Sequence, residues 1–250
     1  MNLIDAHTHI HFSQYEQAAQ LARKGLWQLV TATSPAEWDC VLDLARTSPR
    51  IIPTCGLHPW YADAFDPNSL EVCLKQAPII GEIGLDRVWT DVPLVQQQEA
   101  FIYQLELAVD LGKPLILHTK GAEVEVLQEL RRCGPDRAIV HWYSGDARLL
   151  PAYIELGCYF TLGPDIHTNP AVQAVCRQVP LERLLTETDG IEAVEWAQGK
   201  PCSLEDVAEV LLRIIDTAAT LRGLAPVQMQ ERVYANAQAF LAGTIGGLSH

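Results

Sequence analysis

The segment over residues 26–57 reads LWQLVTATSPAEWDCVLDLARTSPRIIPTCGL, with an apolar run at each end and helical spacing between them. The runs at 26–33 and 51–57 predict strands buried on both faces, as the strands of parallel sheets are. Between them, Ser34-Pro35 is a helix start signal, and the apolar spacing predicts a helix over Pro35–Thr47. Strand, helix and strand in this order indicate a parallel sheet with helical crossovers.

The same alternation extends from this unit toward both ends of the chain. Predicted strands are Leu3–His7, Leu26–Thr33, Ile51–Leu57, Ile79–Gly84, Pro114–His118, Ala138–Trp142, Cys158–Leu162 and Leu184–Thr188. Predicted helices are Tyr15–Lys24, Pro35–Thr47, Pro67–Lys75, Gln96–Leu111, Glu123–Arg132, Ala147–Leu156, Pro170–Val179, Ser203–Arg222 and Pro226–Leu241. Eight such strands predict an α/β fold, a (β/α)8 TIM barrel. No GxGxxG motif follows the first strand and no linker divides the chain, so we expect residues 1–250 to form a single domain.

Composition places the chain among folded proteins that lack a broad nucleic-acid-binding surface. Of its 250 residues, 48% are hydrophobic and 20% are charged, which excludes disorder as the main state. Eighteen Lys and Arg against 31 Asp and Glu give a net charge of −13, so any nucleic-acid contact must be local. The seven cysteines form no CxxC pair, and no apolar run is long enough to cross a membrane. We therefore expect a cytoplasmic protein with reduced cysteines, no membrane association and no obligate protein partner.

The motif Asp5-Ala6-His7-Thr8-His9 lies at the end of the first predicted strand. Residues two apart in an extended chain point to the same side, so His7 and His9 can present two imidazoles to one metal ion. A chance pair of surface histidines explains an isolated HxH motif equally well. The motif alone therefore leaves both interpretations open.

Further residues of the types that bind metals follow other predicted strands. Together with His7 and His9, they are Glu82, His118, His141 and Asp189. The carboxyl ends of the strands form the active face of a (β/α)8 barrel, so these side chains are expected to meet in one bowl. Each alone could have a separate hydrogen-bond partner, but one pair of divalent cations satisfies all six. Four histidines and two carboxylates thus predict a site for two metal ions.

The ligand candidates lie within longer motifs. These are Asp5-Ala6-His7-Thr8-His9, Gly56-Leu57-His58-Pro59, Gly81-Glu82-Ile83-Gly84-Leu85-Asp86, His118, His141-Trp142-Tyr143-Ser144-Gly145, Glu187-Thr188-Asp189, and Asn236 with Phe240. In order and spacing they resemble the TatD-type metal-dependent hydrolases and deoxyribonucleases, which belong with the amidohydrolase-like barrels. The resemblance spans nearly the whole chain.

The resemblance implies a binuclear centre that uses Mg, Mn or Zn. The implied ligands are His7, His9 and Asp189 for one ion, His118 and His141 for the other, and Glu82 as a bridge between them. The resemblance also implies that Asp189 is the general base toward the attacking water, and that His58 lies near the substrate or an additional ion. Members of this family typically cleave phosphodiester bonds in DNA.

The sequence departs from the family pattern around the expected substrate site. Lys120 stands where the family often has Arg, which keeps a charge that can meet a phosphate but loses the bidentate fork. Gly190-Ile191-Glu192 replaces the usual small residue and proline, and Trp142 and Tyr143 stand where smaller residues are common. We expect a rebuilt substrate rim, with Lys120 or His58 binding substrate and stabilising negative charge.

Other side chains near the predicted strand ends have open roles. Aromatic residues that could either stack on unpaired bases or pack at the rim are Trp60, Tyr61, Trp89, Trp142 and Tyr143. Glu187 shares the parity of Asp189 and is expected to orient a ligand or to make a structural hydrogen bond. Asp5 shares the parity of His7 and is expected to support the pair of His7 and His9.

Three functions follow from these observations. The leading hypothesis is a metal-dependent hydrolase, a deoxyribonuclease that cleaves phosphodiester bonds at single-stranded or frayed DNA ends, because a narrow barrel mouth does not easily admit duplex. The first alternative keeps the two metals and hydrolyses a small amide, ester or lactone. The net charge and Lys120 favour that alternative, whereas Glu82 in place of a carboxylated lysine favours the TatD type. The second alternative is a non-catalytic metal-binding barrel, against which the complete ligand set argues.

Overall fold

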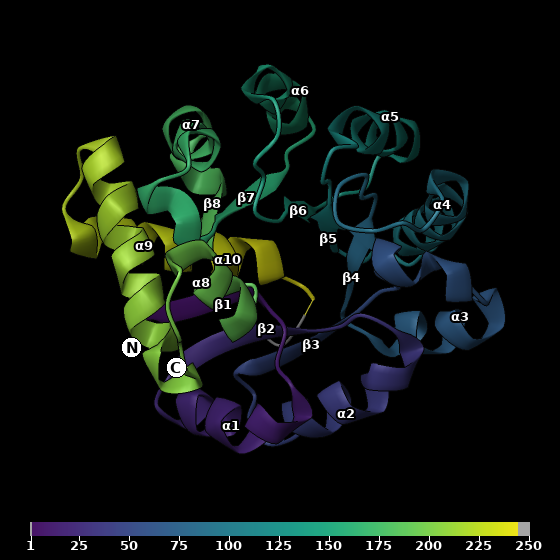
Figure 1. Cartoon of the computed structure of the whole chain (residues 1–250), viewed down its shortest axis with the longest axis horizontal. Helices are drawn as coiled ribbons and strands as arrows, with labels where there is room; N and C mark the ends of the chain where they lie inside the picture. The colour runs from purple at the N-terminus through teal and green to yellow at the C-terminus, as the bar shows by residue number, and fades with distance from the viewer. Residues whose placement is uncertain (1, 245–250) are drawn as a thin grey trace.

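Eight short apolar strands form one parallel sheet that curls into a barrel in the computed structural model, which describes residues 2–244 (Figure 1). The strands are β1 (Leu3–Thr8), β2 (Leu26–Ala32), β3 (Ile51–Cys55), β4 (Ile79–Gly84), β5 (Leu115–His118), β6 (Ala138–Val140), β7 (Tyr159–Leu162) and β8 (Leu184–Thr186). Their order in the sheet follows the chain, and each is parallel to its neighbours. The predicted (β/α)8 barrel is confirmed as a single domain, although residues 1 and 245–250 of the expected domain lie outside the described residues.

Helices follow the strands, and most of them lie around the outside of the sheet, whereas the short helix α8 lies in front of the ring of strands in Figure 1. They are α1 (Tyr15–Arg23), α2 (Pro35–Ala45), α3 (Pro67–Gln76), α4 (Leu94–Asp110), α5 (Glu123–Cys133), α6 (Leu150–Glu155), α7 (Pro170–Gln178), α8 (Ile191–Gln198), α9 (Val207–Arg222) and α10 (Pro226–Leu241). The start signals in the sequence explain several of them. Pro35 is the first residue of α2, and the side chain of Asn169 caps α7 by accepting a hydrogen bond from the backbone N–H of Ala171.

The strands are buried on both faces, as expected for parallel strands covered by helices. Every residue of β1 and β4 is buried, including the polar ones. All seven cysteines are free, which agrees with the expectation from their spacing. None of the helices in residues 2–244 has the length and apolar character needed to span a membrane.

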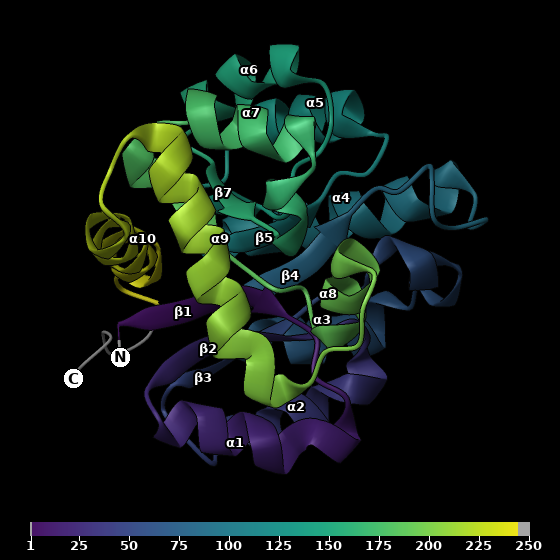
Figure 2. The same cartoon turned by 60° about the vertical axis from the view of Figure 1, so that its left-hand side comes forward.

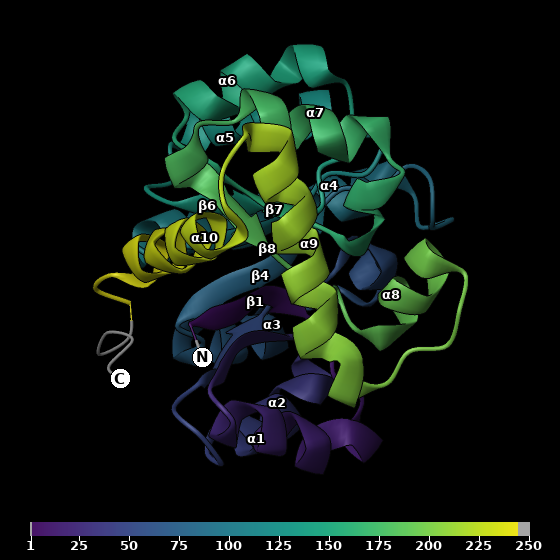
Figure 3. The same cartoon turned by 90° about the vertical axis from the view of Figure 1, so that its left-hand side faces the viewer.

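The first and last strands meet through hydrogen bonds that involve side chains. The backbone N–H and the hydroxyl of Thr188 donate to the two carboxylate oxygens of Asp5, at 2.9 and 2.5 Å. The N–H of Asp189 donates to the carbonyl of His7 at 3.1 Å. Helices α9 and α10 pack against both strands and cover this join (Figures 2 and 3). The two helices close the ring as predicted, and Asp5 joins the strands that carry His7 and Asp189.

Four strands end earlier than the sequence predicts, and one ends later. The predicted strand Leu26–Thr33 ends at Ala32, Ile51–Leu57 ends at Cys55, and Leu3–His7 extends to Thr8. The predicted strand Ala138–Trp142 ends at Val140, because Trp142 has a φ of 35° and turns the chain out of the sheet. The predicted strand Leu184–Thr188 ends at Thr186, and the helix α8 that follows was not predicted. Gly190 and Gly199, both with positive φ, bracket that helix.

Candidate metal centre

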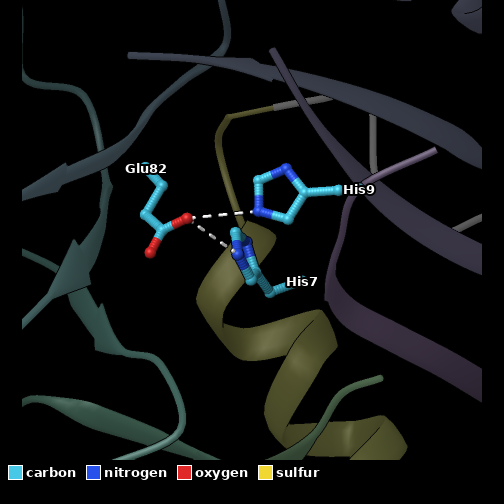
Figure 4. Close-up of side chains that lie close together, drawn as sticks. All are labelled: His7, His9 and Glu82. Carbon is cyan, nitrogen blue, oxygen red and sulfur yellow. Dashed lines mark hydrogen bonds and ion pairs between the residues drawn. The ribbon is translucent and has the colours of Figure 1, made fainter. Parts of the chain in front are cut away.

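All six predicted metal ligands lie at the carboxyl ends of the strands. They are His7 in β1, His9 directly after it, Glu82 in β4, His118 at the end of β5, His141 directly after β6, and Asp189 after β8. His7 and His9 point to the same side of the chain, as their spacing of two residues predicts, and both rings face Glu82 (Figure 4). His7 is fully buried, whereas the side chain of His9 is 31% exposed because it lies beyond the strand end.

Glu82 lies at the centre of the cluster and faces two separate groups of histidines. Its Oε2 atom is 3.2 Å from Nε2 of His7 and 3.2 Å from Nε2 of His9 (Figure 4). Its Oε1 atom is 2.7 Å from Nδ1 of His118 and 2.6 Å from Nε2 of His141. One carboxylate therefore presents each of its oxygens to a different pair of imidazoles.

Asp189 completes the group on the side of His7 and His9. Its Oδ1 atom is 3.3 Å from Nε2 of His7 and 3.4 Å from Nε2 of His9. Its backbone has a φ of 60°, a left-handed conformation that Asp tolerates better than most residues. A Cβ atom on the next residue, Gly190, would lie 2.8 Å from the carbonyl oxygen of His9. This close approach explains why glycine follows Asp189 in this chain.

Close contact between β4 and β5 places Glu82 beside His118. A Cβ atom on Gly84 would lie 1.9 Å from the carbonyl oxygen of His118, so only glycine fits where β4 ends. The N–H of Leu85 then donates to that same carbonyl at 3.1 Å. The glycine of the sequence motif thus serves the geometry of the cluster.

The chemistry of this donor set fits metal ions. Three overlapping groups of side chains could each hold an ion: His7, His9 and Glu82; His7, His141 and Asp189; and His58, Glu82 and His118. The Nε2 atom of His7 is completely buried and has no hydrogen-bond partner. A buried, unpaired ring nitrogen that faces carboxylates is costly unless it binds a proton or a metal ion.

The buried carboxylates favour protonation of the His7 and His141 rings, because they raise the pKa of both imidazoles. Burial raises the pKa of Glu82, but positive charge on His141 and His7 outweighs this effect and keeps the pKa well below its usual value. Burial lowers the pKa of His7, yet Glu82 outweighs it and raises that pKa to about 9. Metal binding must therefore displace protons from imidazoles.

Three residues outside the ligand set orient its histidines. Asp86 Oδ2 accepts a hydrogen bond from Nε2 of His118 at 2.9 Å, which turns Nδ1 of that ring toward Glu82. The hydroxyl of Thr31 lies 3.1 Å from Nδ1 of His7. Glu187, fully buried, lies 3.5 Å from Nδ1 of His141, in the orienting position that its parity suggested.

Sequence reasoning gave no role to Asp86 or Thr31. Asp86 was visible as the last residue of the Gly81–Asp86 motif, four positions after Glu82, so its signal was present. Thr31 carries no signal, because a threonine in a buried strand is common. Asp5, expected to support the histidine pair, instead joins β1 to β8 through Thr188.

The two predicted substrate-binding residues occupy different places. Lys120 lines a cavity of about 300 Å³ that opens over the cluster, with His118, His141 and Asp189 among its walls. His58 is buried against Glu82, with Nε2 3.5 Å from Oε1, and its Nδ1 accepts a hydrogen bond from the N–H of Trp60. Burial lowers the pKa of His58 to about 4, so the ring is neutral at pH 7. A role for either residue toward substrate stays a prediction.

A parallel barrel with histidines and carboxylates gathered at the carboxyl ends of its strands defines a metal-dependent hydrolase of the TIM-barrel class. The family model of TatD related DNases matches residues 4–242, and the chain belongs to this family. The resemblance read from the motifs is therefore confirmed.

Individual relatives cover most of the chain. It is 28% identical over 254 residues to YcfH of Escherichia coli K12, described as an uncharacterized metal-dependent hydrolase, with 92% of each protein covered. It is 30% identical over 216 residues to the 3'-5' ssDNA/RNA exonuclease TatD of Edwardsiella piscicida, with 79% of this chain and 82% of that protein covered. The crystal structure of the TatD homologue YjjV from Escherichia coli K12 matches with a TM-score of 0.83 at 28% identity, covering 96% of this chain and 97% of that one.

Divalent ions are expected to stabilise the fold. Mg, Mn or Zn added to chelator-treated protein at about 100 times the dissociation constant contributes about 2.7 kcal/mol, which raises Tm by about 5–10 °C in a protein of this size. Differential scanning fluorimetry measures the shift. Absence of a shift with all three ions would contradict the site.

The shift is expected to grow with pH. Protonated His7, with a pKa raised to about 9, stabilises the ion-free fold fully below the unfolded value of 6.5 and loses this contribution as the pH rises through 9. Ions must displace that proton, so their apparent affinity rises over the same range. The increase in Tm on ion addition should therefore be larger at pH 9 than at pH 6, and the opposite order would contradict this account.

Replacement of Asp86 tests the orientation of His118. Asp86 also accepts hydrogen bonds from the indole of Trp60 at 2.7 Å and from the backbone N–H of Trp89 at 2.8 Å. Asp86→Asn is expected to weaken metal affinity by about 10- to 100-fold, measured by competition with a chelating dye. Asp91→Asn, an exposed carboxylate in the same loop, is the matched control. Equal affinity in the two variants would show that Asp86 does not orient the ligand.

Proposed function

We propose that this protein is a phosphodiesterase with a two-metal centre, and that it acts on single-stranded or frayed ends of DNA. The observation that carries the proposal is the position of Glu82, whose two oxygens face different histidine pairs. A carboxylate placed in this way suits a bridge between two ions. Two-metal centres are common in enzymes that displace an oxygen at phosphorus.

Each ion has its own ligands in this proposal. His7, His9 and Asp189 would hold one ion, His118 and His141 the other, and Glu82 would bind both. Bound Mg, Mn or Zn ions polarise the phosphoryl group, lower the pKa of water and neutralise charge in the transition state. The chain contributes the fixed geometry, because Asp86, Thr31 and Glu187 orient the ligand rings.

Asp189 is suited to accept the proton of the attacking water. Its side chain is 21% exposed, so it faces the cavity as well as the cluster. Burial raises its pKa, but the close contact with His7 and the charges of His141 and His9 lower it overall. The carboxylate is therefore ionised at neutral pH and able to take up a proton at the carboxylate oxygen.

Lys120 supplies a positive charge beside the cluster. Its Nζ atom donates a hydrogen bond to Ser144 at 3.1 Å, and no carboxylate in residues 2–244 forms an ion pair with it. A phosphate placed over the cluster can meet this ammonium, as a point charge without a bidentate fork.

The choice of DNA ends rests on three supports. The relative from Edwardsiella piscicida is named a 3'-5' ssDNA/RNA exonuclease. A cavity of about 300 Å³ suits one nucleotide unit better than a duplex. A net charge of −13 opposes broad binding of a polyanion, which favours contact at an end.

The state of the cysteines bears on where the protein acts. All seven are free, which supports action in a reducing compartment, the cytoplasm.

Digestion of labelled oligonucleotides tests the proposal. Single-stranded and blunt duplex DNA are incubated with each ion, with and without chelator, and the single strand is expected to be cleaved faster. Lys120→Met should raise KM for the strand by about tenfold, and Lys120→Arg should restore it, because the loss is that of a charge-assisted contact. Metal bound without cleavage of any phosphodiester would overturn the proposal.

A small ester, amide or lactone is the second candidate substrate. Lys120 is the one Lys or Arg among the described residues that line the cavity, and this together with the net charge of −13 favours such a substrate over a polyanion. Release of p-nitrophenol from p-nitrophenyl acetate, compared with methyl p-nitrophenyl phosphate, separates the candidates. Turnover of the acetate alone would favour this second function.

A further inference from the structure

Three tryptophans from different parts of the chain lie side by side at the cavity. We call Trp142 after β6, Trp196 in α8 and Trp89 in the loop between β4 and α4 the tryptophan wall. The ring centroids of Trp142 and Trp196 are 6.1 Å apart, and those of Trp196 and Trp89 are 6.0 Å apart, both in edge-to-face geometry. The same cavity is lined by His118, His141 and Asp189, so the wall stands beside the metal cluster.

Trp142 is held rigidly in this wall. Its indole N–H donates to Asp165 at 2.7 Å, and its backbone N–H donates to the hydroxyl of Thr161 at 2.9 Å. Its ring lies against Gly163, where a Cβ atom would come within 2.5 Å of the indole. Trp142 is therefore a fixed surface against which Trp196 packs.

Trp89 and Trp196 leave large apolar surfaces uncovered. They are 52% and 64% exposed, whereas Trp27 and Trp38 in the core are 5% and 3% exposed. Indole rings left open beside a cluster of potential metal ligands are typical of a surface that a ligand covers. The ligand must present a flat or apolar face to them.

The positive charge of Lys120 beside these rings indicates a ligand that carries both an anionic group and a planar ring. Nζ of Lys120 lies 5.7 Å from the centroid of the Trp89 ring. An anionic group that binds to Lys120 beside the metal cluster therefore lies close to the indole ring of Trp89, which lines the same cavity. A nucleotide joins a phosphate to a planar base across such a distance, whereas a sugar phosphate or a simple ester has no planar ring to place there.

We propose that Trp89 and Trp196 form a base subsite, which binds the nucleobase of the nucleotide whose phosphate lies at the metal cluster. The proposal rests on the proposed function and adds what determines its substrate: an unpaired base stacked on indole. Stacking on tryptophan tolerates any base, because every base has a π face. A base within a duplex is already stacked and paired, so the subsite selects unpaired strands.

The first test measures binding without catalysis. Tryptophan fluorescence is followed as deoxyadenosine 5'-monophosphate or 2-deoxyribose 5-phosphate is added. The nucleotide is expected to bind about 5- to 100-fold more tightly than the sugar phosphate. Trp89→Ala and Trp196→Ala should each remove most of this preference, and Trp→Phe at either position should keep it. Phe12→Ala, which removes an even more exposed ring on another segment, should leave it unchanged. Equal affinity for the two ligands in the unaltered protein would overturn the proposal.

The second test uses strands with and without bases. The unaltered protein is given a single-stranded oligonucleotide and an oligomer of abasic tetrahydrofuran phosphate units of the same length. The base subsite predicts a kcat/KM about 5- to 100-fold higher for the normal strand, a ratio that Trp89→Ala and Trp196→Ala bring close to one. Equal cleavage of both oligomers would refute the base subsite while leaving phosphodiesterase activity standing. Nucleotide binding without cleavage of either oligomer would refute the proposed activity and leave the base subsite standing.

Discussion

Glu82→Gln is expected to lower kcat/KM for phosphodiester hydrolysis by about a thousand-fold or more, and to leave the purified protein with less bound metal. Each oxygen of Glu82 serves a separate pair of imidazoles, at 2.6 to 3.2 Å, so the substitution affects both halves of the cluster. A neutral amide removes the negative charge that balances the ions and offers one oxygen in place of two. Loss of several kcal/mol of transition-state stabilisation has this effect on the rate.

Metal analysis and steady-state kinetics on the same preparations measure this result. Glu123→Gln is the matched control, because Glu123 lines the same cavity and lies outside the cluster. Glu82 is 1% exposed, so its replacement changes a buried network and could unfold the protein. Circular dichroism is therefore used to check that the variant is folded. A Glu82→Gln protein with full metal content and an unchanged rate would show that Glu82 is not the centre of the site.

The sequence was sufficient to predict which histidines and carboxylates gather at one end of the barrel, because two simple rules apply to them. Alternation along a strand places His7 and His9 on one side, and the carboxyl-end rule of parallel barrels brings Glu82, His118 and Asp189 to the same bowl. Both rules depend only on the order of residues within a strand. They hold even though four of the strands end earlier than predicted.

Residues whose role depends on contacts across the barrel could not be predicted in this way. Thr31 is a partner of His7 because β1 and β2 are adjacent, and nothing in its own surroundings in the sequence indicates this. Trp142 leaves its strand through a left-handed φ, which the apolar pattern of the strand does not signal. Trp196 belongs to α8, a short helix whose flanking glycines were visible but whose packing against Trp142 and Trp89 is tertiary.

Asp189→Asn is expected to lower kcat by about 100- to 10,000-fold, the range that loss of a general base produces. The amide cannot accept the proton of the attacking water at neutral pH. Asp189 also contacts His7 and His9, so part of the loss could come from weaker metal binding. Measuring kcat over a range of metal concentrations separates the two effects, because excess metal refills a weakened site but does not replace a base.

Glu192→Gln is the control for this substitution, since Glu192 is an exposed carboxylate in the first turn of α8, three residues after Asp189. It should keep the rate and the metal content of the unaltered protein. If saturating metal restores the full kcat of Asp189→Asn, Asp189 acts only as a ligand and the proton must go to another group. A rate that stays low at full metal occupancy assigns the proton to the Asp189 carboxylate, whose lowered pKa keeps it ionised before the water attacks.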